Sequence, residues 1–235
     1  MTWSLIARDA CGAFGIAVAT KNFAVGCRVP HIEAGIGAVA TQALSNPFYG
    51  VNGIKLLRAG KSAADVVKTL TAADAGREHR QLHVMDAAGR TAAHTGKDCI
   101  DWCGSTAGEG FSAAGNMLAG PAVIHETAKA YVANAALPFP RRLIAAMKAG
   151  EAAGGDKRGK QSAALLIYSE EGWPDLDLRV DDHTNPLAEL ERLEAVSRER
   201  WVHFSKLLPS KRDPVGIIDR AELDARVTAM LAEAK

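Results

Sequence analysis

The order in which apolar segments follow one another is the feature that most constrains this fold. Short apolar runs with turn residues between them predict strands, and runs with apolar residues at helical spacing predict helices. The predicted strands span 2–7, 13–20, 35–43, 80–96 (as a hairpin), 162–169 and 176–182. The predicted helices span 46–59, 62–74, 121–135, 138–152, 186–207 and 218–234. Strands and helices thus come in groups, which argues against a doubly wound parallel sheet, where they alternate one by one.

Local signals fix several boundaries. Asn46 and Pro47 are typical of a helix N-cap and its first position. Ser62 with Asp65 three residues later resembles a capping box. The sequence DAAGR at 86–90 predicts the turn of a hairpin. Residues 97–120 are glycine-rich and polar, and we expect them to be mostly loop.

The grouped order favours antiparallel sheets with helices on their outer faces. We therefore expect an α+β fold, and this order permits, without requiring, a four-layer sandwich in which two antiparallel sheets pack face to face and a helix pair covers each. Two domains are predicted, a main domain over 1–207 and a C-terminal helical extension over 208–235.

Composition excludes several classes of protein. The net charge of the 235 residues is +1, so no excess of positive charge is available for a nucleic-acid backbone. Neither a membrane-length apolar run nor a basic amphipathic stretch is present, and the start lacks the pattern of a signal peptide. We expect a cytoplasmic protein, without nucleic-acid or membrane partners, in which Cys11, Cys27, Cys99 and Cys103 are free thiols.

Thr2 combines a hydroxyl with an α-amine that becomes free if Met1 is removed. An α-amine has a pKa of about 8, which suits a general base at neutral pH. Threonine paired with its own terminal amine is an established way to activate a weak nucleophile. The strand that begins at once would hold this residue inside a sheet, which makes Thr2 the candidate nucleophile.

The loop GGDKRGKQSA at 154–163 carries two further candidates. Arg158 can pair with Asp156 or bind a carboxylate through its planar guanidinium group. The alternative is a solvated loop with an exposed ion pair.

Asn116 in GNMLAG can donate an N–H to a developing oxyanion, or serve as a cap or turn residue. Lys21 follows the second strand, where its charge would act on a nucleophile or lie in solvent. Thr41 and Gln42 end the third strand and point into a pocket or satisfy a turn.

Metal and cofactor signals are weak. Asp181, Asp182 and His183 are adjacent, and successive side chains of a strand point to opposite faces, so they suit turn and capping roles better than one ion. Cys99 and Cys103 lack the second pair or the histidines of a zinc site. With no phosphate loop or dinucleotide fingerprint, the sequence gives no reason for a cofactor.

Several blocks resemble a known family. They are TWSLIARD, FGIAVATKNFAVGCRVPHIEAGIGAVATQALSNPFYG, GREHRQLHVMDAAGRTAAHTGKDC, GNMLAG, GGDKRGKQSAAL and DLRVDDHTNPLAEL. Over about residues 2–195 the chain is similar to an uncharacterised bacterial and archaeal family, the domain of unknown function DUF1028, which is assigned to the N-terminal-nucleophile (Ntn) hydrolase superfamily.

The resemblance implies the αββα sandwich, with a site at the open end of the sheets and Thr2 as nucleophile. Proteasome-like relatives support their nucleophile with an aspartate and a lysine. The matching stretch here offers Lys21 and His31 but no aspartate. Asn116, Gln42, Asp156 and Arg158 lie in blocks that recur in the family, so they are carried as site candidates.

Three hypotheses remain at this stage. The first is an amidohydrolase that forms an acyl-enzyme on a small-molecule amide or peptide-like substrate. The second is a non-catalytic binding or scaffold protein that keeps the fold. The third, which nothing nearby completes, is a centre built on Cys27 or on Asp182 and His183. Residues 186–207 either pack on the chain's own sheet or form a homo-oligomer contact.

Overall fold

The computed structural model describes residues 2–233. The chain divides into two compact units, one up to Leu190 and one from Glu191 on, and each is described by itself. The boundary expected after residue 207 lies inside the second unit.

The larger sheet has six strands in the order β10-β9-β2-β1-β8-β7, and every neighbouring pair is antiparallel. Its strands are β1 (Thr2–Arg8), β2 (Phe14–Thr20), β7 (Trp102–Gly108), β8 (Phe111–Leu118), β9 (Ser162–Tyr168) and β10 (Leu176–Val180). β1 and β2 lie at its centre, and almost all of their residues are buried. Burial on both faces explains why these strands read as continuous apolar runs.

The second sheet has four strands in the order β3-β4-β5-β6, also antiparallel throughout. Its strands are β3 (Pro30–Glu33), β4 (Gly37–Ala43), β5 (Arg80–Asp86) and β6 (Thr91–Thr95). The predicted hairpin at 80–96 is confirmed, with its turn at 87–90.

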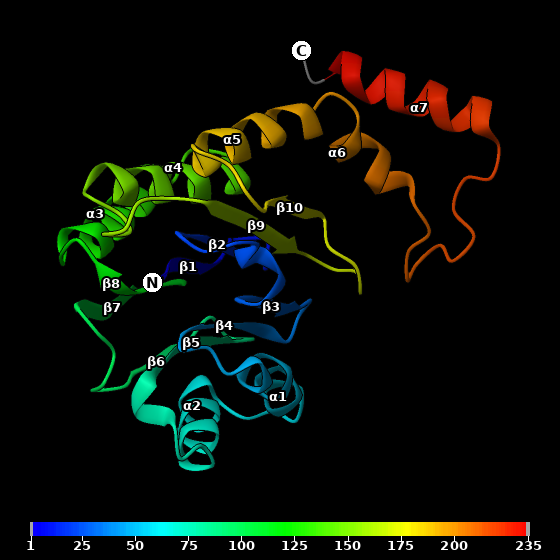
Figure 1. Cartoon of the computed structure of the whole chain (residues 1–235). Helices are drawn as coiled ribbons and strands as arrows, with labels where there is room; N and C mark the ends of the chain where they lie inside the picture. The colour runs from blue at the N-terminus through cyan, green and yellow to red at the C-terminus, as the bar shows by residue number, and fades with distance from the viewer. Residues whose placement is uncertain (1, 234–235) are drawn as a thin grey trace. The chain divides into compact units, whose positions relative to one another are not determined.

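Helices cover the outer face of each sheet, so the first unit has four layers (Figure 1). α3 (Ala122–Ala133) and α4 (Phe139–Ala152) pack on the six-stranded sheet, and α1 (Pro47–Arg58) and α2 (Ala63–Ala72) pack on the four-stranded one. The predicted αββα sandwich is confirmed. Asn46 caps α1 by accepting from the Phe48 N–H, and Ser62 caps α2 by accepting from the Asp65 N–H, both as predicted.

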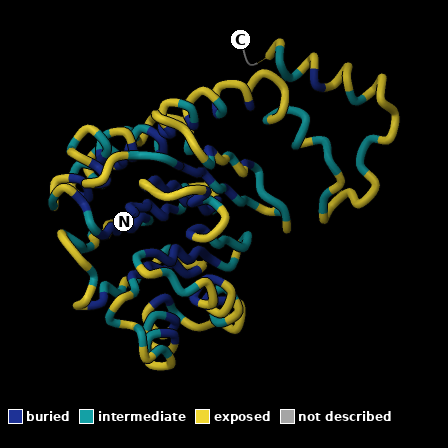
Figure 2. The backbone as a smooth tube through the Cα atoms, in the orientation of Figure 1, coloured by how far each residue is buried: buried dark blue, intermediate teal, exposed yellow. Residues whose placement is uncertain are grey.

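Alternation along the strands separates two apolar layers. Leu82 and Val84 of β5 pack with Val66 and Leu70 of α2. Met85, from the other face of β5, packs between the sheets; this inner cluster comprises Ile6, Phe14, Ile16, Val18, Val25, Val29, Ala38, Ala40, Met85 and Ala164. Figure 2 shows the buried backbone concentrated in the two sheets. The inner cluster fills only part of the layer between the sheets, and polar residues occupy the rest.

Two predicted elements were wrong, and one strand was missed. The segment 97–120 is not mostly loop, because it forms β7 and β8. The strand β3 was not predicted, since a four-residue run that begins with proline carries little apolar signal. The single helix expected over 186–207 is interrupted after α5 (Pro186–Ser197), and the chain resumes with α6 (Trp201–Phe204) and a short 3-10 turn.

The second unit contains the end of α5, then α6 and α7 (Arg220–Glu233). Across residues 2–233, no helix has the length and apolar character that spanning a membrane requires.

Candidate functional site

Thr2 is the first residue of β1 and is 6% exposed. Its Oγ1 lies 3.3 Å from Thr20 Oγ1, at the end of the neighbouring strand β2. On the other side, Thr2 pairs in register with Asn116 of β8, whose Nδ2 lies 3.4 Å from the Thr2 carbonyl oxygen. The candidate nucleophile is thus held between two strands at one end of the sandwich, and Thr20 is a neighbour that sequence reasoning missed.

Asn116 connects Thr2 to a buried polar network between the two sheets. Its Nδ2 donates to Gln81 Oε1 at 3.0 Å, and Gln42 Nε2 donates to the same oxygen at 2.8 Å. Gln81 Nε2 in turn donates to the Gly115 carbonyl oxygen at 2.8 Å, which fixes the orientation of the Gln81 amide. Gln42, Gln81 and Asn116 are each at most 1% exposed. The network therefore ties β4 and β5 of one sheet to β8 of the other.

The same network continues to a buried histidine. Ser4 Oγ donates to Gln42 Oε1 at 2.8 Å and also lies 2.8 Å from His83 Nε2. Ser4 has one hydroxyl hydrogen and gives it to Gln42, so it must accept from His83, and the proton sits on Nε2. Burial lowers the pKa of His83 to about 3, so the ring is neutral at pH 7 and carries a single proton. With that proton on Nε2, Nδ1 accepts from Ser112 Oγ at 3.0 Å.

Asp156 anchors the glycine-rich loop beside Thr20. The Lys21 N–H donates to Asp156 Oδ2 at 2.7 Å, and the Arg158 N–H donates to Oδ1 at 2.9 Å. The Arg158 guanidinium lies 3.2 Å from Oδ2, so the predicted pairing of these two residues is confirmed. The Asp156 side chain is fully buried, whereas that of Arg158 is 38% exposed, so this is a buried carboxylate and not a solvated ion pair. The Lys21 ammonium group contacts the Lys160 carbonyl oxygen at 3.3 Å.

A cavity of about 280 Å³ opens next to Asn116. Its walls come from the end of β4, the residue before β5, the loop after β6, and β8; they are Ala43, Leu44, His79, Asp98, Cys99, Ile100, Asn116 and Met117. Ala43 has φ 70° and Met117 has φ 56°, so the residues directly after Gln42 and Asn116 both have a left-handed backbone conformation. Non-glycine residues held in this conformation cost energy and concentrate at functional sites.

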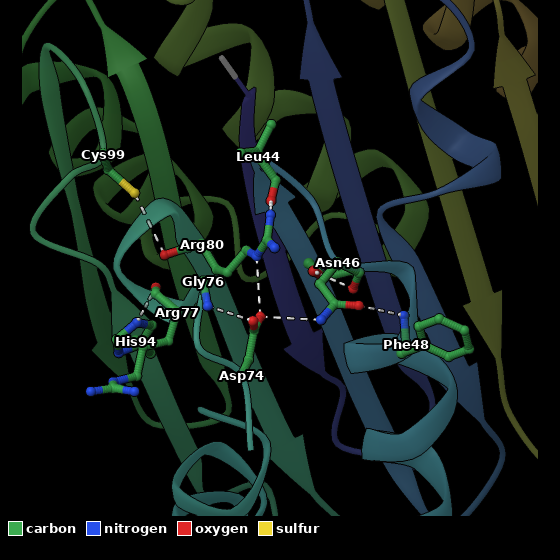
Figure 3. A network of polar contacts seen from close by, with 10 residues as sticks. Leu44, Asn46, Phe48, Asp74, Gly76, Arg77, Arg80, His94 and Cys99 are labelled. Carbon is green, nitrogen blue, oxygen red and sulfur yellow. Dashed lines mark hydrogen bonds and ion pairs between the residues drawn. The ribbon is translucent and has the colours of Figure 1, made fainter. Parts of the chain in front are cut away.

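Arg80 contacts two residues that line this cavity, Leu44 and Cys99 (Figure 3). Its Nη1 donates to the Leu44 carbonyl oxygen, and its own carbonyl oxygen accepts a 3.5 Å contact from Cys99 Sγ. Asp74 accepts from Arg80 Nε at 3.1 Å, from the Gly76 N–H at 2.8 Å and from Asn46 Nδ2 at 3.1 Å. These hydrogen bonds together outweigh burial and hold the pKa of Asp74 below its usual range.

The remaining candidates lie elsewhere. Asp181 pairs with Arg179, Asp182 accepts from Gln161, and His183 Nδ1 accepts from the Asn185 N–H, so this run closes a turn. All four cysteines are free thiols and form no disulfide bond. Within residues 2–233, no group of three or more His, Cys, Asp or Glu residues is placed to hold a metal ion.

The structure thus brings the six site candidates into two groups at the Thr2 end of the sandwich. Asn116 and Gln42 share the inter-sheet network with Thr2. Asp156 and Arg158 lie in the glycine-rich loop, and Lys21, directly after Thr20, donates its backbone N–H to Asp156. Sequence reasoning missed Ser4, Gln81, His83 and Ser112. The only available signal was their polarity at alternate positions of otherwise apolar strands.

Comparison with known proteins places this arrangement in a family. The family model described as "Family of unknown function (DUF1028)" matches residues 2–190. The crystal structure of protein SPO2555 from Silicibacter pomeroyi, of the same family, is 36% identical with a TM-score of 0.85, over 93% of this chain and 99% of that one. Anbu (ancestral beta-subunit) from Yersinia bercovieri is 10% identical with a TM-score of 0.41, over 88% of this chain and 98% of that one. None of the curated proteins compared matches the chain. From the extent of the family match and the 36% identity, we conclude that the chain belongs to the DUF1028 family.

Proposed function

We propose that this protein is an N-terminal-nucleophile amidohydrolase that uses Thr2 to open a small amide or peptide-like substrate. The observation that carries the proposal is the position of Thr2. It begins a central strand, its hydroxyl lies beside Thr20, and its backbone is joined to Asn116, which lines the cavity. The link to the Ntn superfamily rests on the αββα sandwich and on the sequence blocks described above.

The proposed chemistry requires that Met1 is removed. Thr2 Oγ1 then attacks the amide carbonyl carbon, and the hydroxyl proton passes to the α-amine of Thr2. The amine returns the proton to the leaving nitrogen as the C–N bond breaks, which leaves an ester on Thr2. Water activated by the same amine hydrolyses this ester, so the products are a carboxylic acid and an amine or ammonia.

The other candidates receive roles that fit their contacts. Both N–H groups of Asn116 are engaged by Thr2 and Gln81, so the oxyanion falls to backbone N–H groups, and Asn116 offers its carbonyl oxygen. Asp156 fixes the loop, and the partly exposed Arg158 that it holds orients a substrate carboxylate. Gln42 positions Gln81, and Lys21 contributes through its backbone N–H and its charge.

The test is the intact mass of the natively expressed protein before and after exposure to a small β-lactone. We expect loss of Met1 and one acyl adduct that maps to Thr2. Thr2→Ser keeps a hydroxyl and should keep the adduct, whereas Thr2→Ala should lose the adduct and all turnover with its far-UV circular dichroism unchanged. Thr228→Ala in α7 is the matched control. Wild-type turnover in Thr2→Ala would refute the proposal.

One observation favours a second candidate function. At 6% exposure Thr2 is nearly closed off, which suits a small-molecule-binding or scaffold protein that keeps the fold without the chemistry. Retention of Met1 together with the absence of any adduct would select this alternative.

A further inference from the structure

Thr20 places a second hydroxyl group against the candidate nucleophile. It is the last residue of β2 and is 1% exposed, and its Oγ1 lies 3.3 Å from Thr2 Oγ1. Thr2 Oγ1 is the atom that forms and later breaks the bond to substrate in the proposed reaction. The Thr20 hydroxyl therefore contacts a reacting atom, and because this contact lies within the protein, it does not depend on access from solvent.

The length of this contact allows it to strengthen during the reaction. Hydrogen bonds between hydroxyl oxygens are usually about 2.7–2.8 Å long, and those of a resting site are often longer and tighten only as the reaction proceeds. A hydroxyl group can donate or accept. When the proton of Thr2 passes to the α-amine, Oγ1 gains negative charge and can no longer donate. The bond that Thr20 donates is then the favourable one, and a charged acceptor makes it stronger.

The peptide group that follows the Thr20 side chain is held at both ends. The Thr20 carbonyl oxygen accepts from the Gln161 N–H at 2.9 Å, and the Lys21 N–H donates to Asp156 Oδ2 at 2.7 Å. Thr20 also pairs in register with Ser162 of β9. A donor that is fixed before the reaction needs no reorganisation when charge develops, which makes it more effective than a mobile one.

We propose that Thr20 is a catalytic residue whose hydroxyl donates a hydrogen bond to Thr2 Oγ1 while that oxygen carries negative charge. The inference rests on the proposed function for the reaction itself. The proton of Thr2 moves to the α-amine and then to the leaving nitrogen, whereas the proton of Thr20 stays on Thr20, so no further reactant is needed. The same bond assists hydrolysis of the ester, because Oγ1 is then the leaving oxygen.

The test measures how fast a small β-lactone acylates Thr2, by intact mass over a series of lactone concentrations. The series separates the limiting rate of acylation from the concentration that gives half of it. Thr20→Val keeps the branched shape and removes the hydroxyl. We expect it to lower the limiting rate at least about tenfold and to leave the half-saturating concentration within about twofold of the wild type. Thr20→Ser keeps the hydroxyl and should acylate within about threefold of the wild-type rate.

The pH dependence of acylation separates this role from a disturbed N-terminus. The wild-type rate should rise with pH as the α-amine loses its proton, with a midpoint near the pKa of about 8 of a free α-amine. Thr20 does not titrate in this range, so Thr20→Val should lower the rate by the same factor at every pH and keep the midpoint. A disturbed N-terminus would shift the midpoint, since the surroundings of the α-amine would change.

Thr127→Val is the matched control. Thr127 is a fully buried threonine of α3 whose hydroxyl donates to the Val123 carbonyl oxygen at 2.7 Å, within its own helix. This variant also loses a buried hydroxyl, and we expect it to be acylated at the wild-type rate. If Thr20→Val lacks the far-UV circular dichroism of the wild type, Thr20→Ala takes its place and should show the same loss.

Failure of this inference differs from failure of the proposed function. Acylation of Thr20→Val at the wild-type rate, an equal loss in Thr20→Ser or Thr127→Val, or a shifted pH midpoint overturns the role of the Thr20 hydroxyl and leaves Thr2 as the nucleophile. A wild-type protein that gains no adduct on Thr2 refutes the hydrolase and, with it, the role of Thr20.

Discussion

Buried His83 couples the stability of this fold to pH. Burial lowers its pKa to about 3, against about 6.5 in an unfolded chain. Between these values the unfolded state binds a proton that the folded state does not, so stability falls as pH falls from about 6.5 toward 3. We expect His83 to lower the free energy of unfolding of the wild type by about 2 kcal/mol when the pH falls from 7 to 5.

The measurement is urea denaturation at both pH values for the wild type and for His83→Gln. The variant keeps polar atoms but not the titration, so its loss of stability between the two values should be smaller by about 2 kcal/mol. His31, whose pKa burial also lowers, is present in both proteins and cancels in the comparison. Equal slopes would show that His83 titrates normally in the folded state.

The sequence identified some residues of the candidate site and could not identify others. Thr2 stood out because removal of Met1 would leave its hydroxyl beside a free α-amine, and Asp156 because it lies with Arg158 in a glycine-rich loop. Asn116 stood out as a possible amide donor in GNMLAG. Gln81 and His83 alternate with Leu82 and Val84 in β5, a pattern equally typical of a strand with one solvated face. Their partners lie on the other sheet, in β1 and β8, and only the packing of the two sheets reveals that this polar face is buried.

At the scale of elements, the start of α1 depends on a residue outside it. Asp74 follows α2 and accepts from Asn46, the N-cap of α1, and from Arg80, the first residue of β5. We expect Asp74→Ala to lower the free energy of unfolding by about 2–3 kcal/mol at pH 7, because three hydrogen bonds to a carboxylate are lost.

The pH dependence of this effect follows from the lowered pKa of Asp74. A carboxylate with a depressed folded pKa stabilises the fold above its unfolded value of about 3.9, and that stabilisation is lost as pH falls through the folded pKa. The difference between wild type and Asp74→Ala in urea denaturation should therefore shrink at pH 3. Asp177→Ala, at an exposed position of β10, is the control and should stay within about 0.5 kcal/mol at either pH.

Elements were predictable where local chemistry decides them. The caps Asn46 and Ser62 act within one helical turn, so the sequence locates α1 and α2. β7 and β8 are rich in glycine, alanine and serine, which disfavour strands in isolation. They form strands because β8 pairs with the buried strand β1, and this pairing spans more than a hundred residues of sequence. Local propensity holds no information about such a partner.

At the scale of the whole molecule, the family match and the first compact unit end at the same residue. The family model stops at residue 190, and the first unit also ends at Leu190. All ten strands described between residues 2 and 233, and the helices α1–α4 that cover them, lie before this point. The residues named above for the sandwich, its polar network and the cavity all lie before the second unit.

The shared boundary predicts the behaviour of a shortened chain. Because α5 crosses the boundary and Leu187 and Leu190 are fully buried, the cut belongs after Ser197, at the end of that helix. We expect residues 1–197 to unfold in one cooperative transition, with a midpoint within about 4 °C of the corresponding transition of the full chain, a difference equivalent to roughly 1 kcal/mol. Differential scanning calorimetry measures both midpoints, and the NMR signal of the Met117 methyl group, which lines the cavity, reports whether the cavity persists. A shortened chain that melts without cooperativity would show that the second unit completes the fold, and that the sandwich and the tail are one folding unit.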